Sequence, residues 1–182
     1  MTCVIGYIAD DIVYIGGDSA GVDGLNVIVR TDEKVFRNGD FLFGFTTSFR
    51  MGQILRYNFQ LPKRKENISD DEYLYGDFID AILKILKNKH YAKIDNNQIE
   101  GGCFLFGYRG KLYNVSSDFQ IAKPSEKFDA VGCGRNYALG CLYCLKDNHE
   151  MSILEKIEKA LKTAEYFSGG VRSPFYILDL KN

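Results

Sequence analysis

The sequence predicts an α+β protein built as a single domain over residues 1–182. First, strand-like and helix-like segments come in separate runs rather than in alternation. Second, 182 residues, of which 46% are hydrophobic and 14% aromatic, can bury a sizeable core without disulfides or metals. Third, no repeat, low-complexity stretch or linker divides the chain. Two antiparallel sheets packed on each other and covered by helices would satisfy this order.

The chain begins with two predicted hairpins. Residues 2–8 and 12–17 are β-rich runs, and the acidic turn at 9–11 separates them. A looser segment, SAGVDGLNVIVRTDE, leads into KVFRNGDFLFGFT, where the Asn-Gly-Asp turn at 38–40 should reverse one short strand into the next. Both hairpins therefore depend on local turn chemistry.

Helical segments separate these hairpins from a second β-rich block. The apolar positions of SFRMGQILRYNF fall at helical spacing, and Ser69 followed by three acids is an N-cap for a long amphipathic helix that ends near Asn88. The β-rich block comprises GGCFLFGY, KLYNVSS, DFQIAKP and FDAVGCG. Two helices, over residues 135–146 and 152–166, and a last strand, FYILDL, complete the pattern.

Charge and composition exclude several classes of protein. The net charge is −1 and the longest basic block is KRK at 63–65, so the sequence shows no electrostatic footprint for nucleic acid. The N-terminus lacks the basic start of a signal peptide, and no run approaches the roughly 18 apolar residues of a membrane span. Five cysteines in apolar surroundings indicate reduced thiols. We therefore expect a soluble cytoplasmic protein.

Thr2 is a candidate nucleophile, because removal of Met1 would place it first in the chain. A threonine hydroxyl reacts only when a base removes its proton, and a free α-amine, with a pKa of about 8, is such a base at neutral pH. A small second residue generally permits methionine removal. Taken alone, however, a threonine at this position more often simply opens a strand.

Two charged residues follow Thr2 at equal intervals of sixteen positions, Asp18 and Lys34. If Lys34 points inward toward the Thr2 hydroxyl, desolvation lowers its pKa and a nearby carboxylate raises it again. Asp18 is the natural carboxylate for that role. The positive charge of Lys34 would then favour the Thr2 alkoxide. Taken alone, however, Asp18 is more often a turn cap after two glycines, and Lys34 a solvated lysine at a strand edge.

Several segments together carry a resemblance to a known family. They are TCVIGYIADDIVYIGGDSAG, the equal spacing of Thr2, Asp18 and Lys34, and the later segments AVGCGRNYALGCLYCL and ALKTAEYFSGGV. In this order they resemble the proteasome β-subunit and HslV-type N-terminal nucleophile hydrolases. The resemblance extends from Thr2 to about Leu178, which is nearly the whole chain.

The resemblance implies a fold, an activity and partners. The fold would be a four-layer αββα sandwich, in which two antiparallel sheets are flanked by helices. The activity would be that of a threonine peptidase subunit in a self-compartmentalising protease, without a metal or organic cofactor. The partners would be unfolded polypeptide substrates, further copies of the chain in a ring, and an ATP-driven unfoldase.

The resemblance also implies a set of site residues. Gly44 would supply the backbone N–H that binds the oxyanion, and Gly21, Asp32 and Leu42 would lie near the substrate pocket. The whole catalytic set implied is Thr2, Asp18, Lys34, Gly44, Cys133, Glu165 and Ser168.

Two members of this set depart from the family pattern. Cys133 stands where the family has a serine that contacts the threonine amine, and a thiol is a weaker hydrogen-bond partner. Glu165 stands where the family has aspartate and carries its carboxylate one methylene further out. A catalytically inactive proteasome-like scaffold is therefore an alternative. A third is an N-terminal nucleophile amidase acting on a small amide, although such enzymes more often begin with Cys or Ser and lack the Lys34 spacing.

Overall fold

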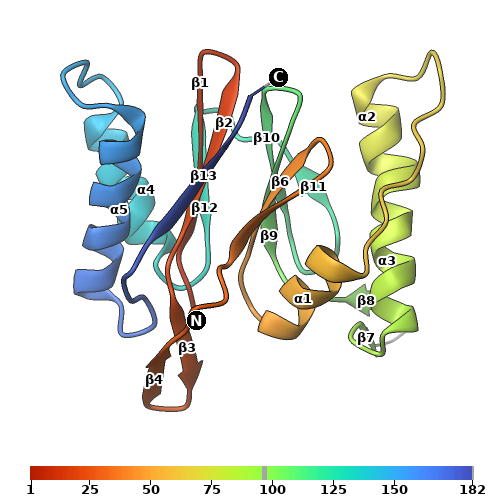
Figure 1. Cartoon of the computed structure of the whole chain (residues 1–182), viewed down its shortest axis with the longest axis horizontal. Coiled ribbons are helices and arrows are strands. Elements are labelled where there is room, and N and C mark those ends of the chain that lie inside the picture. The colour runs from red at the N-terminus through yellow and green to blue at the C-terminus, as the bar shows by residue number, and fades with distance from the viewer. Residues whose placement is uncertain (96–97, 182) are drawn as a thin grey trace.

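The computed structural model describes residues 1–95 and 98–181 (Figure 1). Its strands are β1 (Val4–Ala9), β2 (Ile12–Gly17), β3 (Ala20–Asp23), β4 (Asn26–Val29), β5 (Val35–Asn38), β6 (Phe41–Phe45), β7 (Lys93–Asp95), β8 (Gln98–Glu100), β9 (Phe104–Tyr108), β10 (Lys111–Val115), β11 (Ile121–Ala122), β12 (Phe128–Val131) and β13 (Tyr176–Leu180). Its helices are α1 (Phe49–Tyr57), α2 (Asp70–Tyr73), the π-helical turn η1 (Leu74–Phe78), α3 (Ile79–Asn88), α4 (Arg135–Leu145) and α5 (Ile153–Phe167).

Two antiparallel sheets form the centre of the described chain. One has the order β12-β1-β2-β13, and the other has the order β11-β10-β9-β6-β5. In Figure 1 the sheets stand beside each other, with α4 and α5 outside the first and α1, α2 and α3 outside the second. The predicted α+β class with antiparallel sheets is thus what the chain adopts.

Three apolar clusters hold these elements together. One lies between the two sheets and includes Val4, Ile15, Leu42 and Leu105. The second joins the five-stranded sheet to α1 and α3, and the third joins the four-stranded sheet to α4 and α5. Because side chains alternate along a strand, Val4 of β1 belongs to the first cluster and Ile5 to the third.

The long predicted helix after Ser69 begins as expected and is then interrupted. Ser69 and Glu72 form a reciprocal capping box at the start of α2, which satisfies two N-terminal N–H groups. The π-helical turn η1 follows, and Gly76 inside it has non-helical angles of φ −112° and ψ −105°. Glycine is a poor helix former, so the regular α-helical hydrogen-bond pattern is interrupted at this residue. The helix resumes in α3 and ends at Asn88 as predicted.

The structure differs from the prediction in three short segments. The stretch expected to be loose forms the hairpin β3–β4, which extends beyond the sheets close to the N-terminus in Figure 1. A second small hairpin pairs β7 with β8, and DFQIAKP contributes only the two-residue strand β11. The predicted turns at 9–11 and 38–40 do join β1 to β2 and β5 to β6.

Within the described ranges, no helix is long and apolar enough to cross a membrane.

Candidate functional site

Thr2 lies immediately before β1, at the end of the sheets where β3 and β4 extend (Figure 1). It is buried, and its backbone carbonyl accepts a hydrogen bond of 3.2 Å from the N–H of Gly134. Its hydroxyl donates to the carbonyl oxygen of Met1, and its backbone N–H donates to Sγ of Cys133 at 3.3 Å. The nucleophile candidate is therefore held by the segment between β12 and α4.

Lys34 and Asp18 meet at Thr2 as predicted. Nζ of Lys34 lies 2.7 Å from Oγ1 of Thr2 and 2.8 Å from Oδ1 of Asp18. The three residues come from different places in the fold: Thr2 precedes β1, Asp18 follows β2, and Lys34 precedes β5. The side chains of Lys34 and Asp18 are only 1% and 0% exposed, so the ion pair is shielded from water.

Backbone donors fix the carboxylate of Asp18. Oδ1 accepts from the N–H of Cys3 at 3.0 Å, and Oδ2 accepts from Ala20 at 2.9 Å and from Arg172 at 3.2 Å. These donors belong to the start of β1, the start of β3 and the loop before β13. Asp18 therefore ties three segments together while it orients the Lys34 ammonium toward Thr2.

Burial sets the electrostatics of the site. Desolvation lowers the pKa of Lys34, and the nearby Asp18 carboxylate opposes part of that shift. Burial raises the pKa of the Cys3 thiol, and the Asp18 charge raises it further. Cys3 thus stays a neutral thiol, and its side chain lies in the cluster under α4 and α5, because successive side chains point to opposite faces of a strand.

Cys133 and Ser168 lie on the backbone nitrogen side of Thr2. Sγ of Cys133 is 3.3 Å from the Thr2 nitrogen and 3.3 Å from Oγ of Ser168. Gly132, just before Cys133, has a φ of +99°, and its backbone packs against the Thr2 carbonyl so closely that a Cβ there would clash. A thiol therefore contacts the atom that would become the α-amine on removal of Met1, and a hydroxyl contacts that thiol.

Glu165 contacts the loop before β13 through Ser173. Its carboxylate accepts hydrogen bonds from the N–H of Ser173 at 2.8 Å and from the Ser173 hydroxyl at 3.1 Å. Ser173 follows Arg172, whose N–H binds Asp18. Glu165 therefore positions the loop that orients Asp18, and the longer side chain relative to aspartate reaches this loop from α5.

The expectation for Gly44 is not met. Gly44 lies inside β6, where its backbone pairs with Val35 on one side and Leu105 on the other. A Cβ on Gly44 would come within 2.5 Å of Val4 and 2.6 Å of Ile15, so the missing side chain allows the two sheets to approach each other. Its position in the sheet interior, and not beside Thr2, explains the glycine.

The loop after β6 supplies a better candidate for an oxyanion donor. Thr46, Thr47 and Ser48 line a cavity of about 50 Å³ together with Thr2. Thr47 has a φ of +71°, and the N–H of Ser48 donates across it to the Thr46 carbonyl at 2.8 Å. Among the residues that the structure describes, the Thr47 N–H has no acceptor. A left-handed threonine is uncommon and was not signalled by the sequence.

The three residues expected at the pocket lie in different places. The prediction that Leu42 lies near the pocket is wrong, because its side chain is buried in the cluster between the sheets. Gly21 lies in β3 beside the side chain of Arg30. Asp32 forms a two-point ion pair with Arg30, at 2.7 and 2.6 Å, and lines a second cavity of about 80 Å³.

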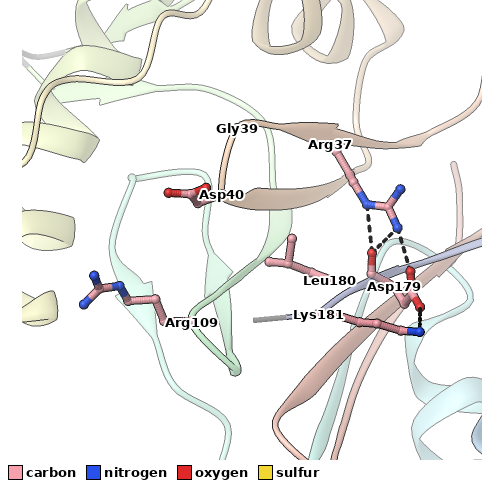
Figure 2. Close-up of a pocket in the computed structure, with 7 residues that line it drawn as sticks. All are labelled: Arg37, Gly39, Asp40, Arg109, Asp179, Leu180 and Lys181. Carbon is pink, nitrogen blue, oxygen red and sulfur yellow. Dashed lines mark hydrogen bonds and ion pairs between the residues drawn. The ribbon is translucent and has the colours of Figure 1, made fainter.

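A much larger hollow lies away from Thr2. It has a volume of about 780 Å³ and is lined by the turns after β5 and β9 and by the end of β13. Figure 2 shows that Arg37 and Lys181 both point to Asp179 at its edge, whereas Arg109 and Asp40 point away from that pair. The described residues contain no group of three or more His, Cys, Asp or Glu side chains placed to hold a metal ion.

Comparisons with known proteins give a curated relative and similar solved structures. No family model matches the chain. The ATP-dependent protease subunit HslV of Aquifex aeolicus is 26% identical over 165 residues, which cover 90% of this chain and 88% of that protein. The structure of Thiobacillus denitrificans BPH in complex with epoxomicin is similar over 99% of this chain and 100% of that chain, with a TM-score of 0.83 and 19% identity.

The eukaryotic HslV from Trypanosoma brucei is also similar, over 99% of both chains, with a TM-score of 0.72 and 17% identity. The relatives confirm the resemblance to HslV and proteasome-type N-terminal nucleophile hydrolases. The structural likeness shows that the fold is shared.

Proposed function

We propose that this chain is a threonine-type peptidase subunit, in which removal of Met1 exposes Thr2 as a nucleophile with its own base. One observation carries the proposal: the Lys34 ammonium, paired with Asp18, lies 2.7 Å from the Thr2 hydroxyl oxygen in a buried setting. The likeness to an ATP-dependent protease subunit over most of both chains supports the same reaction type.

The first chemical step is attack by the Thr2 hydroxyl. In the chain with Met1, the Thr2 nitrogen is an amide and cannot act as a base. Once Met1 is removed, the α-amine takes the hydroxyl proton, directly or through a water, and Oγ1 attacks the carbonyl carbon of the substrate peptide bond. The Lys34 ammonium stabilises the developing negative charge on Oγ1 because it is close and shielded from water.

The second element is stabilisation of the oxyanion. We assign this role to the Thr47 N–H in place of Gly44, because Thr47 lines the Thr2 cavity. One such donor contributes roughly 3 kcal/mol in related acyl-transfer enzymes. Collapse of the intermediate transfers the proton from the Thr2 amine to the leaving amine and produces an ester on Thr2. Water activated by the same amine then hydrolyses the ester.

Cys133 and Ser168 would orient the amine. The 3.3 Å contacts from Sγ of Cys133 to the Thr2 nitrogen and to the Ser168 hydroxyl link the three groups. Since a thiol hydrogen-bonds weakly, the hydroxyl of Ser168 is the stronger member of this pair. Glu165 and Arg172 would act through Asp18, by holding the loop that orients it.

We further propose that the chain works as a ring of identical subunits with an ATP-driven partner. The Aquifex aeolicus relative is an ATP-dependent protease subunit, which supports a partner of this class. In such an assembly the substrate would be unfolded polypeptide that reaches Thr2 from inside the ring.

Intact-mass analysis and peptide turnover test the proposed chemistry. Protein made with normal methionine processing should lack Met1 and should hydrolyse fluorogenic peptides, and Thr2→Ala should reduce kcat/KM at least about 10³-fold. Thr163→Ala is the matched control. The Thr163 hydroxyl donates to the Lys159 carbonyl within α5 and to Sγ of Cys141 on α4, away from Thr2. Retained Met1 in the native protein would contradict the peptidase proposal. Loss of Met1 without turnover, even with an unfoldase, would favour the inactive scaffold.

A further inference from the structure

Two small cavities near Thr2 share a wall made by two aromatic side chains. The first, of about 50 Å³ in the chain that carries Met1, is lined by Met1, Thr2, Lys34, Ala20, Val22 and the loop after β6. The second, of about 80 Å³, is lined by Asp32, Glu33, Gly52, Gln53, Arg56 and Tyr57. Phe45 and Phe49 line both. The two phenylalanines are therefore what separates the space at the nucleophile from the space behind it.

The Phe49 ring is held in this dividing position by cations and by Phe45. The Arg30 guanidinium lies 3.8 Å from the Phe49 ring centroid, and the Lys34 ammonium lies 5.5 Å from it. The Phe45 ring meets it edge to face at 5.7 Å. Arg30 is itself fixed by its two-point ion pair with Asp32. Both cations near the ring are therefore themselves held by an aspartate.

The first cavity suits a small apolar group. Ala20, Val22, Phe45 and Phe49 form its apolar wall, and Met1, Thr2 and the loop residues Thr46, Thr47 and Ser48 line the rest. The Lys34 ammonium already binds Asp18 and Thr2. The second cavity adds length, and its acids have partners: Asp32 binds Arg30, and Glu33 lies 3.8 Å from Arg56. A long side chain reaches this second space only if the Phe49 ring is absent.

We propose that Phe49 determines specificity: it restricts the substrate residue on the acyl side of the scissile bond to small apolar side chains. This inference rests on the proposed peptidase function, because it concerns the residue that enters the cavity beside Thr2. Replacement of Phe49 by a small residue joins the two cavities and admits long apolar and aromatic side chains. Substrates with basic side chains stay poor, because the carboxylates of Asp32 and Glu33 are already paired with Arg30 and Arg56.

Turnover of matched peptides tests this role. We would compare fluorogenic peptides that differ only in an Ala, Phe or Arg before the scissile bond, with processed wild type and Phe49→Ala. In wild type kcat/KM should be highest for Ala, and in Phe49→Ala the Phe-to-Ala ratio should rise about 10- to 100-fold. Tyr75→Ala, a half-exposed aromatic on η1, is the matched control and should leave the ratio unchanged.

A second variant and a binding measurement keep the outcome decisive. Phe49→Leu keeps an apolar contact with Phe45 and should shift the ratio in the same direction by less. The second measurement is the dissociation constant, determined by calorimetry, of peptides that end in Ala or Phe. The two proteins compared are Thr2→Ala and the double variant Thr2→Ala, Phe49→Ala, neither of which hydrolyses the peptides. A shift in this binding ratio without any turnover in wild type would overturn the peptidase proposal and support the role of Phe49. An unchanged ratio in both measurements would overturn the role of Phe49.

Discussion

Two ion pairs on neighbouring stretches of the chain have opposite surroundings. Lys34, just before β5, pairs with Asp18 at 2.8 Å, and both side chains are essentially unexposed. Arg37, within β5, pairs with Asp179 at 2.6 Å, and the two side chains are 51% and 34% exposed. Both pairs link β5 or its leading residue to the four-stranded sheet, yet only the first lies next to a nucleophile candidate.

Burial, and not the size of the neighbouring hollow, distinguishes the ion pair beside Thr2 from the exposed one. The hollow whose lining residues are drawn in Figure 2 lies beside Arg37 and Asp179. Its volume is about 780 Å³, against about 50 Å³ for the cavity at Thr2. A buried ion pair is costly to desolvate and adds little net stability, whereas a surface pair is cheap to form. The buried Lys34–Asp18 pair therefore indicates function, and the size of a hollow does not.

The largest expected effect comes from removal of one buried charge. Lys34→Met leaves the Asp18 carboxylate buried without its cation, and we expect the free energy of unfolding to fall by roughly 3–5 kcal/mol. Urea unfolding of wild type and variant measures this difference. Peptide turnover should also be lost, because Thr2 loses its neighbouring positive charge.

The double variant Asp18→Asn, Lys34→Met separates these two effects. It removes both charges, so most of the lost unfolding free energy should return while turnover stays absent. A single Lys34→Met variant within about 1 kcal/mol of wild type, in the range of a surface pair, would contradict the contrast between the two pairs.

The pH dependence of turnover should also distinguish the pairs. Burial lowers the pKa of Lys34 below its ordinary value of 10.5, so the alkaline limb of kcat/KM should lie below pH 10.5 as the ammonium is lost. In the window between the folded and unfolded pKa values, the unfolded chain binds the extra proton, so the free energy of unfolding from this group rises with pH.

The comparison variant for this measurement is Arg37→Met. A guanidinium stays protonated across the whole range, so the exposed pair contributes no titration and the profile should match wild type. A wild-type alkaline limb at or above pH 10.5 would show that Lys34 is not the group whose charge supports turnover.

Local sequence chemistry was enough for much of the fold. The turns at 9–11 and 38–40 and the capping box at Ser69 follow from a few adjacent residues, and each is present. The β3–β4 hairpin was missed because β4 carries mostly exposed residues, so the alternation that marks a half-buried strand is weak there. The interruption at Gly76 gave only the signal of one glycine inside a helical pattern.

The catalytic set was predictable where the resemblance to a known family supplied it, and unpredictable where it depends on loops. The spacing of Thr2, Asp18 and Lys34 repeats that of the family, and each of the three lies close to the end of a regular strand, where the structure brings them together. Gly44 was misassigned because a strand glycine that lets two sheets approach looks the same in sequence as one that faces a ligand. Thr47 could not be found, since its positive φ comes from the turn held by Cys103 and Ser48.

The smallest expected effect belongs to the exposed pair. Asp179→Asn removes the charge but keeps the backbone carbonyl that also accepts from Arg37, so the variant isolates the ionic contribution of Asp179 with Arg37 and the more distant Lys181. Because water and salt screen this pair, the free energy of unfolding should fall by about 0.2–1 kcal/mol, and the loss should shrink in roughly 1 M salt. Urea unfolding at low and high salt measures both values, with turnover unchanged. A loss above about 2 kcal/mol that salt does not reduce would show that the Arg37–Asp179 pair behaves energetically like the buried Lys34–Asp18 pair, and would contradict the contrast between them.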